Sequence, residues 1–412
     1  FSDQVLLLGL SPGDGESLES RSGVIDLTTY WRVQQPVNQD YALVFTLIDG
    51  LGRPYAEASS GQQTSLWSPD QYARQQQSLL LWPGTPPGEY SLRVAVVDPS
   101  TGAVLDTTRP DGEPLGRSYE LSLVTVSDST PSLRPDGWEP ARLLAADLGV
   151  GMALLGIDAP SGEVDAGGTL NLTLYWQAAG TMAEDWQVEL RLLEADGTAL
   201  AQEVFAPGQA SYPTSAWRPG DVVRDARAFR VPARTPSGCY ALCVATVGVS
   251  DAAGAACHPV LHVTVRAPCR DYRVPSMQHP LDRVIGNAVA LLGYDIDSQP
   301  SASGEPVELK LFWRAEAEMA RSYTVFVHVV DANGRTVAQS DVVPGDGVRP
   351  TTGWLPGEIV PSIHLLEPPA GCTDGCYALR IGMYDRVTGE RLPVSGHADL
   401  DSVLLSDALC CQ

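Results

Sequence analysis

A serine between two glycines is the first feature of this 412-residue chain that could do chemistry. The stretch Gly9–Gly13, GLSPG, matches the G-x-S-x-G pattern of hydrolases, in which a strand leads into a strained serine and then a helix. Residues 14–23, DGESLESRSG, are typical of a loop instead, and related segments later in the chain carry Asp158 and Asp295 in place of Ser11. We therefore expect no catalytic residues and no enzymatic activity, and we keep a hydrolase built on Ser11 as an alternative.

Metal chemistry has one candidate set of ligands, which is Cys257, His258, His262 and Cys269. On a strand the two histidines would share a face while Cys257 pointed the other way, and zinc sites usually contain a C-x-x-C pair that this chain lacks. Acidic loops at 293–299 (GYDIDSQ) and 345–347 (GDG) could hold calcium, but their spacing does not resemble an EF-hand. The sequence therefore predicts no metal and no cofactor.

Eight cysteines could form disulfides: Cys239, Cys243, Cys257, Cys269, Cys372, Cys376, Cys410 and Cys411. They allow about 105 pairings, so the connectivity depends on how strands pair. A turn centred near residues 253–254 would place Cys239 opposite Cys269. Cys376 occupies the matching position in the next repeat, which predicts a bridge from Cys376 to Cys410 or Cys411.

The remaining pairs follow by elimination and do not fit simple strand opposition. They are Cys243 with Cys257, and Cys372 with whichever C-terminal cysteine is left. An even number of cysteines in an acidic chain that lacks a starting methionine favours an oxidising setting. We therefore expect a processed or excised protein that is extracellular or attached to the cell surface.

The charge of the chain excludes several partners. The formal net charge is −23 and the isoelectric point is near 4.5, which repels nucleic acid and anionic membrane surfaces. No apolar run approaches the ~20 residues of a membrane helix, so we expect no membrane insertion. Hydrophobic residues make up 44%, which is enough for a folded protein, and the length indicates about three domains.

A threefold internal repeat is the strongest signal in the sequence. Its landmarks are an LLG triplet beginning at Leu7, Leu154 and Leu291; a strand-end tryptophan at Trp31, Trp176 and Trp313; a W-x-P turn at Trp67, Trp217 and Trp354; and a tyrosine at Tyr90, Tyr240 and Tyr377. Between the second and third copies, all four landmarks are separated by the same 137 positions. Constant spacing of this kind indicates a repeated structural unit.

Each copy reads as short antiparallel strands. In LTLYWQ, residues 172–177, every second residue is apolar and faces one way, and Asp-Gly and Asn-Gly pairs such as Asp49-Gly50 and Asn333-Gly334 predict tight hairpins. We predict an all-β protein of three tandem immunoglobulin-like antiparallel β-sandwich domains, 1–130, 131–268 and 269–412. Short proline-rich linkers at 127–140 and 266–280 should join them into a semi-rigid rod.

The repeated tryptophan should be a core residue, whereas its outward neighbour is harder to place. That neighbour is Tyr30, Tyr175 or Phe312. It could pack across strands on a half-covered face, or it could contact a neighbouring domain or subunit.

The third copy resembles a known module. Its segments QHPLDRVIGNAVALLGYDID, GWLPGE and CYALRIGMYDRVTGERLPV resemble a β-sandwich module of Chloroflexota-type bacteria. The resemblance implies an extracytoplasmic unit that is appended to membrane glycosyltransferase-like proteins or strung along other surface proteins. It covers nearly all of copy three, is weaker over copies one and two, and implies no catalytic residue.

Two functions are compatible with these observations. The first is a secreted, non-enzymatic structural protein that self-assembles into a homo-oligomer, filament, sheath or tube. FSDQVLLLGL lacks the lead-in segment that precedes the other two copies, so the strand after Phe1 should present an open edge for assembly. The alternative is a carbohydrate-binding or adhesive module set from a larger surface protein, with Trp82 and Trp138 as candidate sugar contacts. Asn171 begins a glycosylation sequon.

Overall fold

The computed structural model describes residues 1, 5–12, 19–20, 23–61, 63–109, 114–127, 137–247, 257–296, 306–345, 347–367, 375–396 and 400–411. These residues form β-strands joined by turns, and the helical turns among them are the short 3-10 helices η1 (Thr64–Leu66), η2 (Thr214–Ala216) and η3 (Thr351–Gly353). The strands pair almost entirely antiparallel, in two sheets per repeat that enclose apolar side chains. The predicted all-β, antiparallel fold is confirmed.

The first sheet pair follows the first copy of the repeat. Its strands are β1 (Val5–Pro12), β2 (Glu19–Ser20), β3 (Val24–Val33), β4 (Ala42–Ile48), β5 (Pro54–Ser60), β6 (Tyr72–Leu80), β7 (Gly88–Val97), β8 (Thr107–Thr108), β9 (Pro114–Gly116) and β10 (Tyr119–Val126). One sheet has the order β1-β3-β6 and the other β2-β10-β7-β4-β5, while β8 and β9 form a separate ribbon. Trp31, Phe45 and Tyr90 lie in the core between the two sheets.

The second sheet pair repeats this plan with one additional strand. Its strands are β11 (Arg142–Asp147), β12 (Met152–Asp158), β13 (Glu163–Asp165), β14 (Thr169–Ala178), β15 (Gln187–Leu193), β16 (Ala199–Phe205), β17 (Val222–Arg230), β18 (Gly238–Val247) and β19 (His258–Arg266). The sheets have the orders β11-β12-β14-β17 and β13-β19-β18-β15-β16. Trp176, Trp217 and Phe229 fill their common core.

The third sheet pair matches the second in its first sheet. Its strands are β20 (His279–Ile285), β21 (Val289–Ile296), β22 (Val307–Ala315), β23 (Tyr323–Val330), β24 (Thr336–Val342), β25 (Ile359–Leu366), β26 (Gly375–Asp385) and β27 (Val403–Cys411). The sheets have the orders β20-β21-β22-β25 and β24-β23-β26-β27. Trp313 and Trp354 are fully buried between them. We call the sheet that carries the strand-end tryptophan the Trp sheet of each pair.

The landmark residues form these elements for identifiable reasons. The indole of each strand-end tryptophan is buried and donates to a side-chain oxygen; for Trp31 that oxygen is the Thr29 hydroxyl, at 2.9 Å. The hairpins turn at glycines with positive φ, including Gly197 and Gly334 as predicted. In the first copy the prediction that Gly50 has the positive φ was wrong, because Gly52 has it instead. In that loop the Asp49 carboxylate accepts hydrogen bonds from the backbone N–H groups of Leu51 and Arg53.

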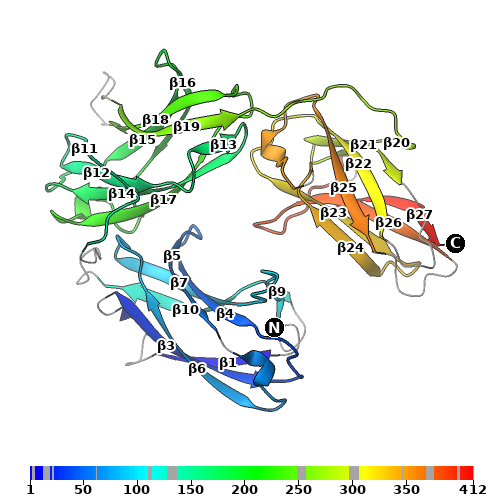
Figure 1. Cartoon of the computed structure of the whole chain (residues 1–412), viewed down its shortest axis with the longest axis horizontal. Helices are drawn as coiled ribbons and strands as arrows, with labels where there is room; N and C mark the ends of the chain where they lie inside the picture. The colour runs from blue at the N-terminus through cyan, green and yellow to red at the C-terminus, as the bar shows by residue number, and fades with distance from the viewer. Residues whose placement is uncertain are drawn as a thin grey trace.

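The three sheet pairs do not lie in a straight line (Figure 1). The second and third pairs lie next to each other in this view, and the first lies below them, so the expectation of a rod is corrected to a bent arrangement. Hydrogen bonds join the first pair to the second and the second to the third, and they are described below. The linker residues 128–136 lie outside the described residues.

Candidate functional site

The Trp sheets differ in the number of their strands, and this difference defines the candidate site. In the second and third pairs a lead-in strand, β11 or β20, pairs antiparallel with β12 or β21 and forms the sheet edge. In the first pair the sheet has three strands and β1 is itself the edge. Within the part of the chain that the structure describes, β1 therefore pairs with a strand on one side only.

The segments that contain the lead-in strands also cover the outer face of the Trp sheet. Just ahead of β11, Trp138 packs edge-on against Tyr175 with ring centroids 4.7 Å apart, and Tyr175 is only 4% exposed. Just ahead of β20, Met277 packs against the cluster that contains Phe312, which is 5% exposed. The outward neighbour of the tryptophan thus packs under the chain's own lead-in segment in two of the three copies.

The same face of the first pair is open. Leu8, Tyr30 and Tyr72 occupy the positions of Leu155, Tyr175 and Val222 in the second pair. Their exposed fractions are 47%, 40% and 69%. We call Leu8, Tyr30 and Tyr72 the open face. Because these residues lie on β1, β3 and β6, the open face spans all three strands of the sheet.

Phe1 is placed differently from the predicted assembly edge. Its ring is buried, 5.7 Å from the ring of Trp31, and its ammonium donates to the Val5 carbonyl at 3.0 Å. This bond from Phe1 to the Val5 carbonyl matches the bond that the Leu148 N–H donates to the Met152 carbonyl in the second copy. Phe1 therefore fills a core position, and the candidate edge is β1 itself.

A buried carboxylate fixes the junction between the first and second pairs. Asp225 is fully buried and accepts from the indole of Trp176 at 3.1 Å, from Arg227 Nε at 2.7 Å and from Arg53 Nη1 at 3.1 Å. Arg53 comes from the β4–β5 hairpin of the first pair, where its Nε also donates to Asp49 at 2.7 Å. Burial raises the pKa of Asp225, and the Arg227 guanidinium opposes this shift.

Arg224 crosses the same junction in the opposite direction. Its guanidinium donates to the Pro54 carbonyl at 2.9 Å and lies 4.6 Å from the ring centroid of Trp82. Its backbone N–H donates to the Gly84 carbonyl at 2.7 Å. Trp82, a candidate sugar contact, is thus stacked on an arginine in the junction, as Trp138 is packed on Tyr175.

Arginines also hold the second pair against the third. Arg230 donates to the backbone carbonyls of Met319 at 2.6 Å, Thr352 at 3.0 Å and Ala320 at 3.1 Å. Arg270, in the linker between them, donates to the Ala233 carbonyl on one side.

On the other side of that linker, Arg270 pairs with the fully buried Glu358, and Arg349 pairs with the same carboxylate. Gly167 and Gly353 approach so closely at this junction that a methyl group on Gly167 would overlap the backbone of Gly353. The three pairs are therefore joined by specific contacts as well as by linkers.

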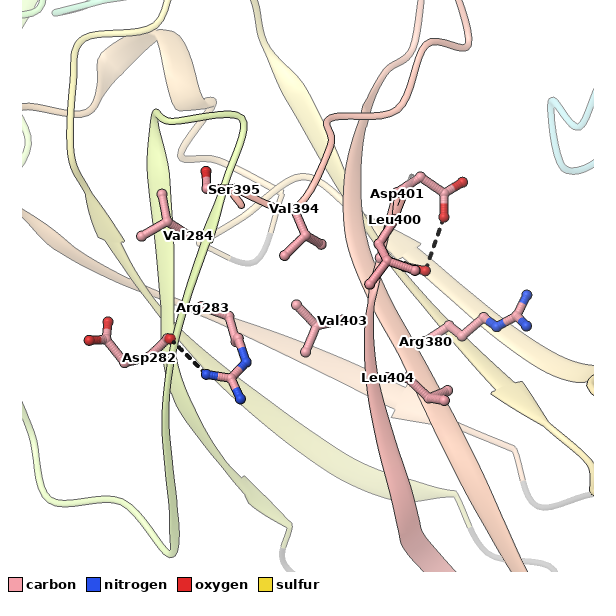
Figure 2. Close-up of a pocket in the computed structure, with 11 residues that line it drawn as sticks. Asp282, Arg283, Val284, Arg380, Val394, Ser395, Leu400, Asp401, Val403 and Leu404 are labelled. Atoms are coloured by element: carbon pink, nitrogen blue, oxygen red, sulfur yellow. Dashed lines mark hydrogen bonds between the residues drawn. The ribbon is translucent and has the colours of Figure 1, made fainter. Parts of the chain in front are cut away.

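The described surface contains open cavities, one on the third sheet pair and one at the junction of the first two pairs. Figure 2 shows an open cavity of about 790 Å³ between β20 and β27, with Val394 and Val403 at its centre. Arg283 lies on one side and Arg380 on the other, and Asp401, on the rim, bonds to Arg391 outside the lining. Its described lining includes no histidine, cysteine or tyrosine. Its two serine hydroxyls donate to neighbouring side chains, Ser395 to Asn287 at 2.7 Å and Ser402 to the adjacent Asp401 carboxylate at 3.1 Å.

A second cavity lies at the junction of the first two pairs and contains the sequon. Its volume is about 810 Å³, and it is lined by the β4–β5 hairpin, Asn171 and Arg227, among others. Asn171 is exposed on β14, with Thr173 two residues further along the strand. A glycan on Asn171 would therefore enter the groove between the first and second pairs.

Two of the predicted disulfides are present in the structure. Cys376 is bonded to Cys410, which lies directly opposite it in the sheet, and Cys243 is bonded to Cys257. Cys372 lies outside the described residues, and the structure does not describe the side chain of Cys411.

The predicted bridge between Cys239 and Cys269 was wrong, because both are exposed free cysteines. The strand register places Cys239 opposite Thr264, five residues before Cys269. The register between β18 and β19 therefore differs by five residues from the one expected for a turn near residues 253–254.

The other candidate groups do not assemble into a site. Because Cys257 is in a disulfide, it cannot be a metal-bound thiolate beside His258 and His262. Among the described residues, no group of three or more histidine, cysteine or acidic side chains is arranged to hold a metal. Ser11 lies within strand β1, and both acidic loops extend into positions that are not described.

The residues that join the sheet pairs were not predicted from the sequence. The sequence contains a signal for one of them, Asp225. It lies on the same inward-facing side of its strand as Val223 and Phe229, and the equivalent position in the third copy is Ser362. A charge in a core series indicates a buried ionic partner. Arg230 and Arg270 bond mainly to backbone carbonyls, and a backbone acceptor leaves no signal in the sequence.

Comparisons with known proteins add little to this description. No protein-family model matches the chain, and no curated protein matches it. Among solved structures, the chain is similar to the crystal structure of dimeric latent PorU from Porphyromonas gingivalis, at 12% identity and a TM-score of 0.25. The match covers 99% of this chain and 34% of that one, so this chain spans about a third of its length. Such a TM-score supports no inference.

Across the described residues, no helix has the length and apolar character that crossing a membrane requires.

Proposed function

We propose that this chain is a secreted, non-enzymatic structural protein that assembles with copies of itself at the cell surface or as an extracellular filament, sheath or tube. Its building blocks are three tandem immunoglobulin-like β-sandwich domains with the boundaries predicted from the repeat. Two tyrosine hydroxyls support the immunoglobulin-like assignment: Tyr90 donates to the Pro86 carbonyl at 2.7 Å and Tyr240 to the Pro236 carbonyl at 3.0 Å. Such a bond to the backbone four residues upstream is typical of the tyrosine corner.

The open face of the first sheet pair is the observation that carries this proposal. A β-edge and three exposed apolar side chains are costly for an isolated molecule and favourable in an assembly, because a partner removes both from water. The arginine junctions support a mechanical role, since buried ion pairs and carbonyl contacts resist bending between units. The two disulfides agree with an oxidising location outside the cell. The resemblance of copy three to a surface-protein module points the same way.

Assembly can be tested by sedimentation and electron microscopy over a range of concentrations. The purified chain should form larger species as its concentration rises. Leu8→Lys should suppress them, because a lysine on an edge strand opposes strand pairing. Val387→Lys is the matched control, since Val387 is 94% exposed and far in sequence from the open face. Monomers at every concentration would refute self-assembly.

A further inference from the structure

The glycosylation sequon at Asn171 lies on one wall of the groove between the first and second sheet pairs. Asn171 and Thr173 are both on β14, and both line this groove of about 810 Å³. The β4–β5 hairpin, from Leu51 to Pro54, lines it from the first pair. Among the described residues, neither the Asn171 carboxamide nor the Thr173 hydroxyl has a hydrogen-bond partner. The two sequon side chains are therefore available to another molecule in the groove.

The strand next to Asn171 carries small side chains, which leave this space open. In the register of β14 and β17, Ala228 lies opposite Asn171, and Ala226 lies two residues away on the same face. In the third pair the equivalent positions on β25 are Leu365 and Ile363, and β22 contains no Asn-x-Ser/Thr triplet. The second copy thus combines the sequon with the space that a sugar requires.

The rest of the groove offers contacts that suit a sugar. A methyl group on Gly52 would meet nothing within 4 Å, so the tip of the hairpin leaves room beside it. Leu51 is 79% exposed and provides an apolar surface for the C–H groups of a sugar ring. On β16, Glu203 lines the groove and has no hydrogen-bond or ion-pair partner among the described residues. Its carboxylate can therefore accept hydrogen bonds from sugar hydroxyls.

We propose that Asn171 carries an N-linked glycan whose first sugars occupy this groove and brace the junction between the first and second sheet pairs. This inference does not depend on self-assembly and shares with the proposed function only the export of the chain. A volume of about 810 Å³ lies in the range that holds a drug-sized ligand, so the first sugars fit while later ones extend into solvent. The glycan adds its contacts to a junction that Arg53 and Asp225 already hold.

The modification is a group transfer without oxidation or reduction. The Asn171 carboxamide nitrogen attacks the anomeric carbon of an oligosaccharide that is linked to a polyprenyl diphosphate. A carbon–nitrogen bond forms, the carbon–oxygen bond to the diphosphate breaks, and the nitrogen loses one proton. Thr173 completes the triplet that a transferase recognises.

Peptide mapping by mass spectrometry of the exported chain from its natural source tests the site. The peptide that contains Asn171 should carry a glycan, and peptide-N-glycosidase should remove it and leave an aspartate at that position. In a secretory host that glycosylates Asn-x-Ser/Thr triplets, Thr173→Ala should abolish the modification. Thr173→Ser is the matched control, because it keeps the hydroxyl and the triplet. An exported chain with an unmodified Asn171 would overturn the inference and leave the proposed function standing.

Amide hydrogen exchange tests whether the glycan occupies the groove. Enzymatic removal of the glycan should make exchange at Leu51 and Arg53 about two- to tenfold faster, the factor that corresponds to about one net hydrogen bond. The control is the hairpin of Asn333 and Arg335 in the third pair, whose N–H groups are bonded to an aspartate in the same way. Exchange there should not change. Equal exchange at Leu51 and Arg53 with and without the glycan would overturn its placement in the groove.

Discussion

Replacing Gly167 with alanine should open the junction between the second and third sheet pairs. Gly167 has a φ of +85°, and its added methyl group would lie 2.9 Å from both the Gly353 nitrogen and the Thr352 carbonyl, with the Gly353 Cα nearer still. Ordinary contact begins near 3.4 Å, so the facing backbones must separate by more than about 0.5 Å. The left-handed φ adds about 1 kcal/mol of strain for any residue with a Cβ.

That separation affects the contacts of Arg230, which donates to three carbonyls of the third pair at 2.6 to 3.1 Å. Hydrogen bonds of a charged donor contribute about 1.5–3 kcal/mol each and weaken steeply with distance. Loss of one or two of them is enough to make the junction mobile. The two sandwiches themselves should stay folded, because the clash lies between them.

Small-angle X-ray scattering measures the expected change. The Gly167→Ala chain should have a scattering curve distinct from the wild type, with a larger radius of gyration or a broader distance distribution. Gly197→Ala is the control: its φ is +87° and its surroundings are open, so it carries the strain without the clash. Both variants should lose about 1 kcal/mol of unfolding free energy from the φ strain. Superposable scattering curves for the two variants would refute the described junction.

Two other predictions concern pH and thiols. Burial lowers the pKa of the His364 imidazole to about 4, whereas in the unfolded chain it is near 6.5. Between pH 6.5 and pH 4 the unfolded chain therefore binds this proton and the folded chain does not. The free energy of unfolding should fall by about 3 kcal/mol as the pH drops through that range. Urea unfolding at pH 7.5 and 4.5 should show this loss in the wild type and not in His364→Gln, and equal losses would contradict it. Alkylation without reductant should label Cys239 and Cys269, whereas Cys376→Ser, which breaks the bond to Cys410, should cost about 2–4 kcal/mol of stability. A mass that shows Cys239 cross-linked to Cys269 would contradict the observed register.

The alternating pattern around Trp31, Trp176 and Trp313 was sufficient to predict the strands and their buried faces, because a two-residue period leaves one arrangement that hides the apolar side chains. The predicted pairing of Cys239 with Cys269 was wrong because the two-residue alternation of apolar side chains does not show by how many residues two neighbouring strands are shifted. A bulge between Leu242 and Cys243 shifts the pairing of β18 and β19 further.

The junctions could not be predicted for a different reason. Arg53 and Asp225 lie 172 positions apart, and nothing in local periodicity connects them. The bent arrangement depends on such long-range pairs. The open face was partly predictable, since Tyr30 was recognised as an outward residue, but its exposure became clear only when Trp138 and Met277 were seen to cover its equivalents.

The hydrogen bonds from Arg230 to main-chain oxygens have an evolutionary consequence. Its guanidinium donates to the backbone carbonyl oxygens of Met319, Ala320 and Thr352, and every amino acid has such an oxygen. The hydrogen bonds of Arg230 therefore do not by themselves constrain which side chains occur at the three accepting positions. The donor has no such freedom, because no other residue type offers a fork of five hydrogens. Modules joined in this way can be exchanged or duplicated only if Arg230 travels together with the other contacts of the junction, which are the pair of Arg270 with Glu358 and the close approach of Gly167 to Gly353.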